Sequence, residues 1–534
     1  MSGPEKFQVL VTDKVSASGL APLLEDERFD VFRIDDTSTP EFREALSVAQ
    51  GLVVRSATTV TAELLAGAPA LRVVGRAGVG VDNIDLEAAT ERGIAVMNAP
   101  AGNTVSAAEL TMALILAVVR QVPAADASVR AGKWERSRFK GIELRGKTLG
   151  LVGAGRIGGE VAVRCMAFGM KVLAYDPYLT DEGARALRIE RGSLDDVLAE
   201  ADVISLHVPL TDDTRGLIGA DALRRMKKST FLVNVARGGV VDEAALAAAL
   251  QEGVIAGAAL DVYAAEPLDE DSPLLEAPNL VLTPHLGAST SEAQELVSQE
   301  ISAAVRAALA EGDLSRALNA PAVSGDVLRA LGPLLDLGRR MGRLACAIVP
   351  GGAREVEVRY AGASDEGQSP LTRYVVMGLL ENVLGEEHVN FVNAAHLARG
   401  RGIGVSSTRS ARRADYTEYL EVVVKAEKGE VTLAGALLGD THPRIVRVND
   451  FHIDVVPAGT LLVLKNRDVP GVIGRVGTLL GARGVNIAEY HQARQDRGGD
   501  ALAAVAVDGG IDAALRSELL ELPEVLSAVV VRLD

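Results

Sequence analysis

Three short segments of the chain each place one chemically capable side chain directly after an apolar run. Arg237 lies in NVARGG, Glu266 in AAEP and His285 in TPHLG. A histidine can take or give a proton near neutral pH, because its unperturbed pKa is about 6.5. A carboxylate on the other ring nitrogen fixes the tautomer, and an arginine can hold a carboxylate through two parallel hydrogen bonds. Each residue alone is more often structural, but the set indicates acid–base chemistry on a hydroxy acid.

A G-x-G-x-x-G pattern precedes these residues and is formed by Gly153, Gly155 and Gly158. It follows a predicted strand and opens a predicted helix, and Asp176 ends the next predicted strand, as a dinucleotide site requires. The glycines allow a tight turn, the approach of a pyrophosphate and close helix–strand packing, while the helix N-terminus attracts phosphate. Asp176 would bind the ribose hydroxyls and repel a 2′-phosphate, so the pattern favours NAD over NADP. The alternative is a glycine turn that binds no ligand.

Apolar runs that alternate with helical segments must position these groups. Continuous hydrophobicity is typical of parallel strands that are buried under helices on both faces. The carboxyl ends of such strands form the ligand crevice, so we expect Arg237, Glu266 and His285 to meet at one edge of a sheet. The predicted strands lie within residues 7–13, 29–35, 51–56, 71–78 and 94–100, and then within 146–177, 202–210, 230–238, 254–263 and 280–288.

The length of 534 residues is too great for one hydrophobic core. A long amphipathic helix predicted at 291–310 should return to the first domain. The order βαββαβ near the end of the chain predicts a ferredoxin-like unit. The predicted fold class is α/β, with two doubly wound, Rossmann-like parallel-sheet domains followed by an α+β domain and a ferredoxin-like domain. We expect the domains to comprise residues 1–100 with 291–320, 101–290, 321–456 and 457–534.

The composition disfavours several function classes. A net charge of −17 and an aromatic content of 3% argue against nucleic acid and acidic membranes as partners. Cys165 and Cys346 cannot form a disulfide framework or a cysteine-rich metal site, so we expect free thiols, a cytoplasmic location and no metal. The most apolar stretch, 110–119, is shorter than the ~20 residues that span a bilayer. Residues 1–13 lack the apolar core of a signal peptide.

The motifs resemble those of the D-2-hydroxyacid dehydrogenase family, through VARGGVVDEAAL, ALDVYAAEP and TPHLGAST. The resemblance is closest to the long-form branch that acts on 3-phospho-D-glycerate, through VVGRAGVGVDNIDLEAATERGIAVMNAPAGNTVSAAELT and KWERSRFKGIELRGKTLG. It implies NAD-dependent oxidation of 3-phosphoglycerate to 3-phosphohydroxypyruvate, the first step of the phosphorylated route to L-serine. It also implies that Arg237 orients the substrate, that Glu266 partners the histidine, and that His285 is the general acid/base.

The same resemblance implies further site residues and a homo-oligomer, either a dimer or a tetramer. For each cleft arginine, the alternative is an ordinary solvated surface charge. For the cofactor, the residues implied are Gly153, Gly155, Arg156, Ile157, Gly158, Asp176, Val208, Pro209, Val235, Ala236, Asp261, His285 and Gly287. For the substrate, they are Arg55, Ser56, Arg76, Gly78 and Asn103, with Arg136 reaching in from a neighbouring subunit.

The last predicted domain resembles the ACT domain, a small amino-acid-sensing module. Its loop NRDVPG and the segment GVNIAEY correspond to the effector site of that family. The resemblance implies Asp468 and Asn486 as contacts for the amino and carboxyl groups of L-serine at an interface between subunits. Some family members carry a bulkier residue at the position of Asn466, which leaves the strength of serine inhibition open. The alternative is a dimerisation module that binds no ligand.

Two other functions remain open from the sequence. The first is another NAD-dependent D-2-hydroxyacid dehydrogenase, such as a glyoxylate or hydroxypyruvate reductase, which the C-terminal domains and the paired Arg55 and Arg76 disfavour. The second is a nucleotide-sensing regulator that has kept the dehydrogenase fold. The complete set of Arg237, Glu266 and His285 disfavours such a regulator, and so does the acidic composition.

Overall fold

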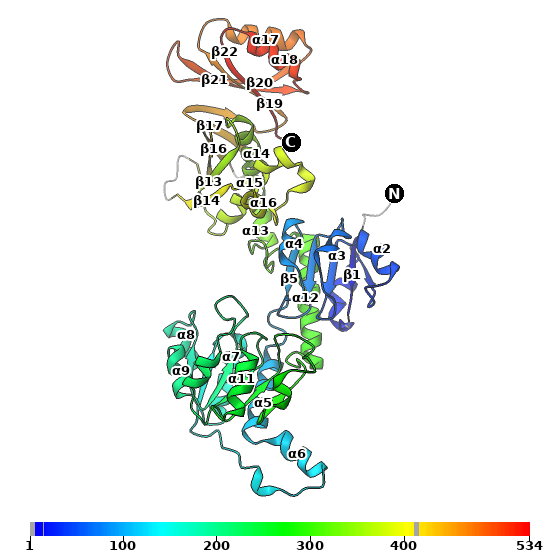
Figure 1. The fold of residues 1–534 in the computed structure, drawn as a ribbon. Helices are drawn as coiled ribbons and strands as arrows, with labels where there is room; N and C mark the ends of the chain where they lie inside the picture. The colour runs from blue at the N-terminus through cyan, green and yellow to red at the C-terminus, as the bar shows by residue number, and fades with distance from the viewer. Residues whose placement is uncertain (1–5, 14, 411–415, 440) are drawn as a thin grey trace.

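The computed structural model describes residues 6–13, 15–410, 416–439 and 441–534. Within these residues, successive stretches of the chain form four β-sheets of five, seven, six and four strands. Figure 1 shows these sheets in a row, with the four-stranded sheet at one end and the seven-stranded sheet at the other. The five-stranded sheet lies next to the seven-stranded sheet. The six-stranded sheet lies between the five-stranded sheet and the four-stranded sheet.

The first sheet and its helices comprise β1 (Phe7–Val11), η1 (Ser18–Leu20), α1 (Ala21–Leu24), β2 (Phe29–Arg33), α2 (Pro40–Val48), β3 (Gly51–Val54), α3 (Ala62–Ala66), β4 (Val73–Arg76), α4 (Leu86–Glu91), β5 (Ala95–Asn98) and α12 (Ser291–Glu311). The strands are parallel, in the order β2-β1-β3-β4-β5. Leu10 and Leu52 pack on the side of α2 and α3, whereas Val9 and Val53 pack against α12. Both faces of the sheet are therefore buried, which explains the continuous apolar runs in these strands.

The second sheet and its helices comprise α5 (Thr104–Val119), α6 (Val122–Arg130), η2 (Arg136–Arg138), β6 (Thr148–Val152), α7 (Arg156–Ala167), β7 (Lys171–Tyr175), α8 (Asp181–Leu187), β8 (Glu190–Arg191), α9 (Leu194–Glu200), β9 (Val203–Leu206), α10 (Ala220–Arg225), β10 (Phe231–Asn234), α11 (Glu243–Gln251), β11 (Gly257–Leu260), η3 (Pro273–Glu276) and β12 (Leu280–Leu282). All pairs are parallel, in the order β12-β11-β10-β9-β6-β7-β8. From β6 the successive strands β7 and β8 are added on one side, whereas β9 to β12 are added on the other side, so the strand order switches between β6 and β9. Ligands bind at the carboxyl ends of the strands at such a switch point.

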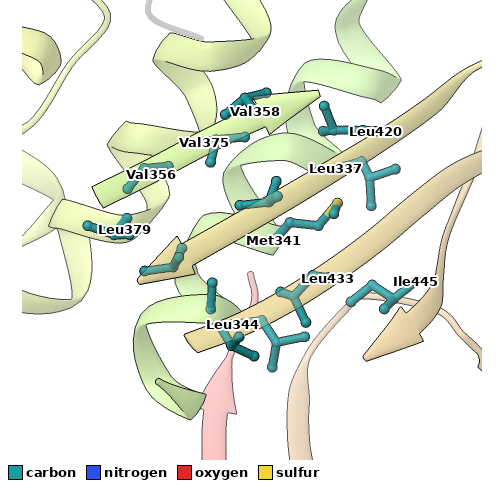
Figure 2. Close-up of a cluster of buried hydrophobic side chains, with 14 of the residues drawn as sticks. Leu337, Met341, Leu344, Val356, Val358, Val375, Leu379, Leu420, Leu433 and Ile445 are labelled. Carbon is teal, nitrogen blue, oxygen red and sulfur yellow. The ribbon is translucent and has the colours of Figure 1, made fainter. Parts of the chain in front are cut away.

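The third domain comprises α13 (Gly325–Ala330), α14 (Gly332–Ile348), β13 (Ala353–Ala361), α15 (Gln368–Leu384), η4 (Glu386–His388), α16 (Ala394–Gly400), β14 (Gly404–Arg409), β15 (Tyr419–Ala426), β16 (Gly429–Leu438), β17 (His442–Val448) and β18 (Phe451–Val455). Its sheet is mixed, because only β13 and β14 pair in parallel. Helices α14 and α15 pack against each other and the sheet, and Leu337, Met341 and Leu379 fill the space between them and the strands (Figure 2).

The fourth domain comprises β19 (Thr460–Arg467), α17 (Val472–Ala482), β20 (Asn486–Arg494), β21 (Asp500–Asp508), α18 (Ala513–Glu521) and β22 (Val525–Arg532). Its antiparallel sheet has the order β20-β21-β19-β22, which is the ferredoxin-like topology. The fold class predicted from the sequence is therefore confirmed for all four units.

The apolar segment that carries α5 is packed inside the protein. Helix α5 contacts α7, β10 and β11, and its buried side chains include Thr111, Leu114 and Ile115. Across the described ranges, no single helix is long and apolar enough to cross a membrane. Helices α5 and α6 are long and apolar enough only when they are taken together, and the chain bends by 62° between them.

Candidate active site

His285 and Glu266 form a hydrogen-bonded pair beyond the carboxyl ends of β12 and β11. Nδ1 of His285 lies 2.7 Å from Oε2 of Glu266, and Oε1 of Glu266 accepts a hydrogen bond from the Tyr263 N–H at 3.1 Å. Because Nδ1 is engaged, Nε2 is the ring nitrogen that can exchange a proton with a ligand. The side chains of His285 and Glu266 are 48% and 37% exposed, so the pair is accessible from the cleft.

Asp261 holds the loop that carries His285. Its carboxylate is fully buried and accepts hydrogen bonds from the Thr283 hydroxyl at 2.6 Å and from the backbone N–H groups of Leu286 at 2.8 Å and Gly287 at 2.9 Å. The carbonyl of Asp261 also accepts from the N–H of His285. His285 has a φ of 54°, a left-handed conformation that is uncommon outside glycine and needs such support. Sequence reasoning assigned Asp261 to the cofactor, and these contacts show that its carboxylate also holds the loop of His285.

Arg237 follows β10 and extends across the cleft to the first domain. The side chain of the buried Asn234 fixes the local turn, because it donates to the Arg237 carbonyl and accepts from the Ala236 N–H. Nη1 of Arg237 donates to the Ala236 carbonyl at 2.7 Å. Nε of Arg237 lies 3.4 Å from Oδ2 of Asp82, which belongs to the loop after β4. The guanidinium is therefore held between the two parallel-sheet domains.

A cavity of about 480 Å³ brings most of the predicted site together. Its walls come from the carboxyl edges of both parallel sheets, as expected for a ligand crevice in doubly wound folds. The predicted residues that line it are Arg55, Ser56, Arg76, Gly78, Asn103, Ile157, Val208, Pro209, Val235, Ala236, Arg237, Glu266, His285 and Gly287.

The glycine loop between β6 and α7 is shaped by close backbone approaches. Gly153 has a φ of 95°, and a Cβ there would lie 2.6 Å from the carbonyl oxygen of His207. A Cβ at Gly158 would lie 2.2 Å from the carbonyl oxygen of Gly153. Around Gly155 a Cβ would meet nothing within 4 Å, so space is open in front of the α7 N-terminus. These residues fit a bound pyrophosphate, which would accept from the free N–H groups of α7.

Asp176 lies just beyond β7 and beside the glycine loop. Its carboxylate accepts hydrogen bonds from the N–H groups of Ala154 at 2.9 Å and Tyr178 at 2.8 Å. The side chain is thus fixed where the ribose of a dinucleotide on this loop would lie. Arg156 is the first residue of α7 and is exposed.

The side of the cavity that Arg55 and Arg76 line is cationic, and it contains buried polar atoms that have no partner in the part of the chain that the structure describes. Burial, together with the smaller effects of the nearby Arg237 and Arg55, lowers the pKa of Arg76 to about 10. Nε of Arg76 and Oδ1 of Asn103 are buried without a hydrogen-bond partner among the described residues. Unpartnered buried groups of this kind are costly, so the cleft is suited to a polar, anionic ligand that satisfies them.

Arg136 does not line this chain's own cavity. It lies in η2, beyond the end of α6, on an arm that projects away from the second sheet (Figure 1). Arg136 is exposed there, next to Trp134, whose side chain is 85% exposed.

The two residues predicted for the effector do not meet within one chain. Asp468 accepts a hydrogen bond from Nη1 of Arg494 at 2.9 Å, and this contact lowers the pKa of Asp468. Asn486 donates to Asp508 at 2.7 Å. Asn486 begins β20 and Arg494 ends it, so roughly 26 Å of extended strand separates the two sites. A ligand that touches both residues would need two copies of the domain.

Two ionisable residues of the cavity wall were missed by sequence reasoning. Asp82 pairs with Arg237 across the cleft. His207 is partly buried, its Nε2 lies 2.8 Å from the Ser205 hydroxyl, and burial lowers its pKa to about 4. The segment SLHVP could have identified His207, because it directly follows a predicted strand of the nucleotide domain.

Three family models match successive parts of the chain. The D-isomer specific 2-hydroxyacid dehydrogenase NAD binding domain matches residues 112–287. The D-3-phosphoglycerate dehydrogenase intervening domain matches residues 330–449, and the ACT domain matches residues 460–524.

Relatives match over nearly the whole chain. D-3-phosphoglycerate dehydrogenase from Bacillus subtilis is 39% identical over 99% of this chain and 100% of its own length. The enzyme of that name from Mycobacterium tuberculosis is 42% identical over 96% of both chains. A crystal structure of D-lactate dehydrogenase from Aquifex aeolicus, complexed with NAD and lactic acid, is 34% identical with a TM-score of 0.51, covering 58% of this chain and 97% of that one. The chain therefore belongs to the D-3-phosphoglycerate dehydrogenases within the D-isomer specific 2-hydroxyacid dehydrogenase family, and it has the NAD-binding domain of that family.

Proposed function

We propose that this enzyme oxidises 3-phospho-D-glycerate to 3-phosphohydroxypyruvate with NAD, the first step of the phosphorylated route to L-serine. The main support is the cavity, in which the His285–Glu266 pair faces Arg237, Arg76 and Arg55. These groups match a substrate that carries a hydroxyl, a carboxylate and a phosphate. The names of relatives aligned over the full length of the chain support the same substrate.

Each side chain of the cavity has a separate role, which follows from its charge and its position. Bound NAD would supply the hydride acceptor for the carbon that carries the hydroxyl. His285 takes the hydroxyl proton on Nε2, so a ketone remains, and Glu266 stabilises the imidazolium through Nδ1. Arg237 binds the substrate carboxylate, because a guanidinium can donate two parallel hydrogen bonds to it. Arg55 and Arg76 bind the phosphate at the first domain.

The direct test is a turnover assay of the purified protein. We expect NAD-dependent oxidation of 3-phosphoglycerate with a kcat/KM far above that for D-lactate or D-glycerate. Faster reduction of glyoxylate or hydroxypyruvate with NADH than of 3-phosphohydroxypyruvate would favour the alternative dehydrogenase. The absence of turnover on all of these acids, together with tight NAD binding, would favour a nucleotide-sensing regulator.

Substitution of the two arginines tests how the phosphate is bound. We expect Arg55→Ala and Arg76→Ala each to lower kcat/KM for 3-phosphoglycerate roughly 10- to 150-fold, since a lost hydrogen bond to a charged group typically costs ~1.5–3 kcal/mol. The control substrate is D-glycerate, which lacks the phosphate and should lose much less. Equal losses on both substrates would instead assign these arginines to the carboxylate or to the fold.

We also infer a preference for NAD over NADP, a homo-oligomer and a cytoplasmic location. Asp176 would repel the 2′-phosphate of NADP and so select NAD. Arg136 would reach the cleft of a neighbouring subunit in a homodimer or homotetramer, which its exposed position on a projecting arm permits. Cys165 and Cys346 are free thiols, which is compatible with a cytoplasmic enzyme.

We also propose that L-serine binds between two copies of the ACT domain and inhibits turnover. Val463 and Val531 of this domain share a hydrophobic core with the third domain, so its deletion would expose that core. A single substitution is the sharper test. Asp468→Asn should abolish serine inhibition without altering basal kcat, whereas Asp496→Asn, in the exposed loop after β20, should not. Unchanged serine binding in Asp468→Asn, measured by calorimetry, would place the effector elsewhere.

A further inference from the structure

We propose that the Asp82 carboxylate competes with the ligand for Arg237: it pairs with Arg237 across the cleft until a ligand carboxylate displaces it. Asp82 lies on the loop after β4 of the first domain, and Arg237 follows β10 of the second. Oδ2 of Asp82 lies 3.4 Å from Nε of Arg237. This inference rests on the proposed role of Arg237 in binding the carboxylate of the substrate, and it does not depend on the substrate phosphate.

The contacts of Arg237 leave little room for two carboxylates at once. Nη1 donates to the Ala236 carbonyl, and Nε faces Asp82. Nη2 lies against the backbone of Gly80, where a Cβ would come within 2.4 Å of Nη2 and 2.7 Å of Oδ2 of Asp82. Two parallel hydrogen bonds to a carboxylate use either the Nε–Nη2 edge or the Nη1–Nη2 edge of the guanidinium. Asp82 lies at the Nε end of the first edge, so a ligand that binds both donors of that edge must displace it.

Asp82 can leave this position while its loop stays in place. Its side chain is 74% exposed, whereas that of Arg237 is 27% exposed. The loop backbone is anchored on both sides, because Nδ2 of Asn83 donates to the carbonyls of Arg55 and Thr58 at 2.6 Å, and Asn98 donates to the Val79 carbonyl. A rotation of the Asp82 side chain is therefore enough to move its carboxylate away from Arg237. Ion pairs this exposed contribute little to stability, so a bidentate ligand can replace one.

The Asp82 carboxylate offsets the positive charges of the neighbouring arginines while the cavity holds no ligand. Arg55, Arg76 and Arg237 converge on one cavity, and the pKa of Arg76 is lowered by burial and by both other arginines, while Asp82 opposes that effect. An anionic ligand takes over this compensating role when it enters. From that point Asp82 repels the ligand, so the residue weakens the binding of substrate and product alike.

Removal of the Asp82 charge should strengthen the binding of anions that use Arg237. We expect Asp82→Asn to lower the dissociation constant of oxalate on the enzyme–NAD complex and the KM for 3-phosphoglycerate by about two- to five-fold. Both decreases should shrink as ionic strength rises, because the pair is exposed. Asp82→Glu, which keeps the charge, should resemble the unmodified enzyme. Glu87→Gln removes one exposed charge from α4 of the same domain and serves as the matched control.

A double-mutant cycle tests whether Asp82 acts through Arg237. In an Arg237→Lys background, the effect of Asp82→Asn on oxalate binding should largely disappear, since lysine lacks the guanidinium edge. A raised KM or a more than ten-fold loss of kcat in Asp82→Asn would overturn the proposal, because Asp82 would then be needed to orient Arg237 productively. Unchanged oxalate binding would also overturn it. Because oxalate binding requires no turnover, these outcomes are separate from any failure of the proposed substrate.

Discussion

Replacement of His285 is expected to lower kcat by roughly 10²–10⁴, the usual contribution of a general acid/base. NAD affinity should remain nearly unchanged, because the pyrophosphate would bind at the glycine loop between β6 and α7, on a different part of the sheet. The pair of assays that checks this is steady-state oxidation of 3-phosphoglycerate and calorimetric titration with NAD. The expected result is a catalytic loss without a binding loss.

The backbone at His285 determines which variant is informative. With a φ of 54°, His285 occupies a conformation that asparagine tolerates better than alanine. His285→Asn therefore removes the imidazole with the least strain on the loop, and His285→Ala adds the effect of that strain. We expect both variants to lose kcat. Near-normal turnover of His285→Asn would exclude His285 as the proton acceptor, whatever His285→Ala does.

Much of the fold could be predicted because its apolar runs are long and uniform. Strands such as β3 and β9 are buried at every position, so pattern alone identified them. Strand β8 was missed, since its two residues, Glu190 and Arg191, are exposed and carry no apolar signal. The third domain was predicted only as mixed α+β, because its core is assembled from amphipathic helices and alternating strands without a chemical motif.

Site residues could be predicted where a short sequence motif places each of them at the end of a strand. They could not be predicted where a contact depends on how two domains pack. Arg237, Glu266 and His285 each follow a strand of one sheet, so the topology brings them to one cavity. The pair between Asp82 and Arg237 joins two domains, and no spacing along the chain encodes it. Asp261 illustrates a third case: its position was recognised, but its hydrogen bonds to the His285 loop appear only once β11 and β12 pair.

Glu266→Gln is expected to lower kcat by up to roughly 10³, less than the complete loss of the histidine. Glutamine keeps the size of the side chain and can still accept from the Tyr263 N–H. It no longer provides the negative charge beside Nδ1 that stabilises the imidazolium. Because the two side chains are partly exposed, water can replace some of that stabilisation, which limits the loss. The measurement is kcat on 3-phosphoglycerate together with the solvent isotope effect, which should rise as proton transfer becomes slower.

Glu243 provides the matched control for this substitution. Its Oε1 accepts a hydrogen bond from the Ala264 N–H at 2.6 Å, so it supports the same loop as Glu266 without touching His285. Glu243→Gln should therefore leave kcat and the isotope effect nearly unchanged. If both variants lost activity equally, the carboxylates would be acting by holding the loop, and the charge of Glu266 would have no separate part in proton transfer. A loss confined to Glu266→Gln would assign the effect to the carboxylate that contacts Nδ1.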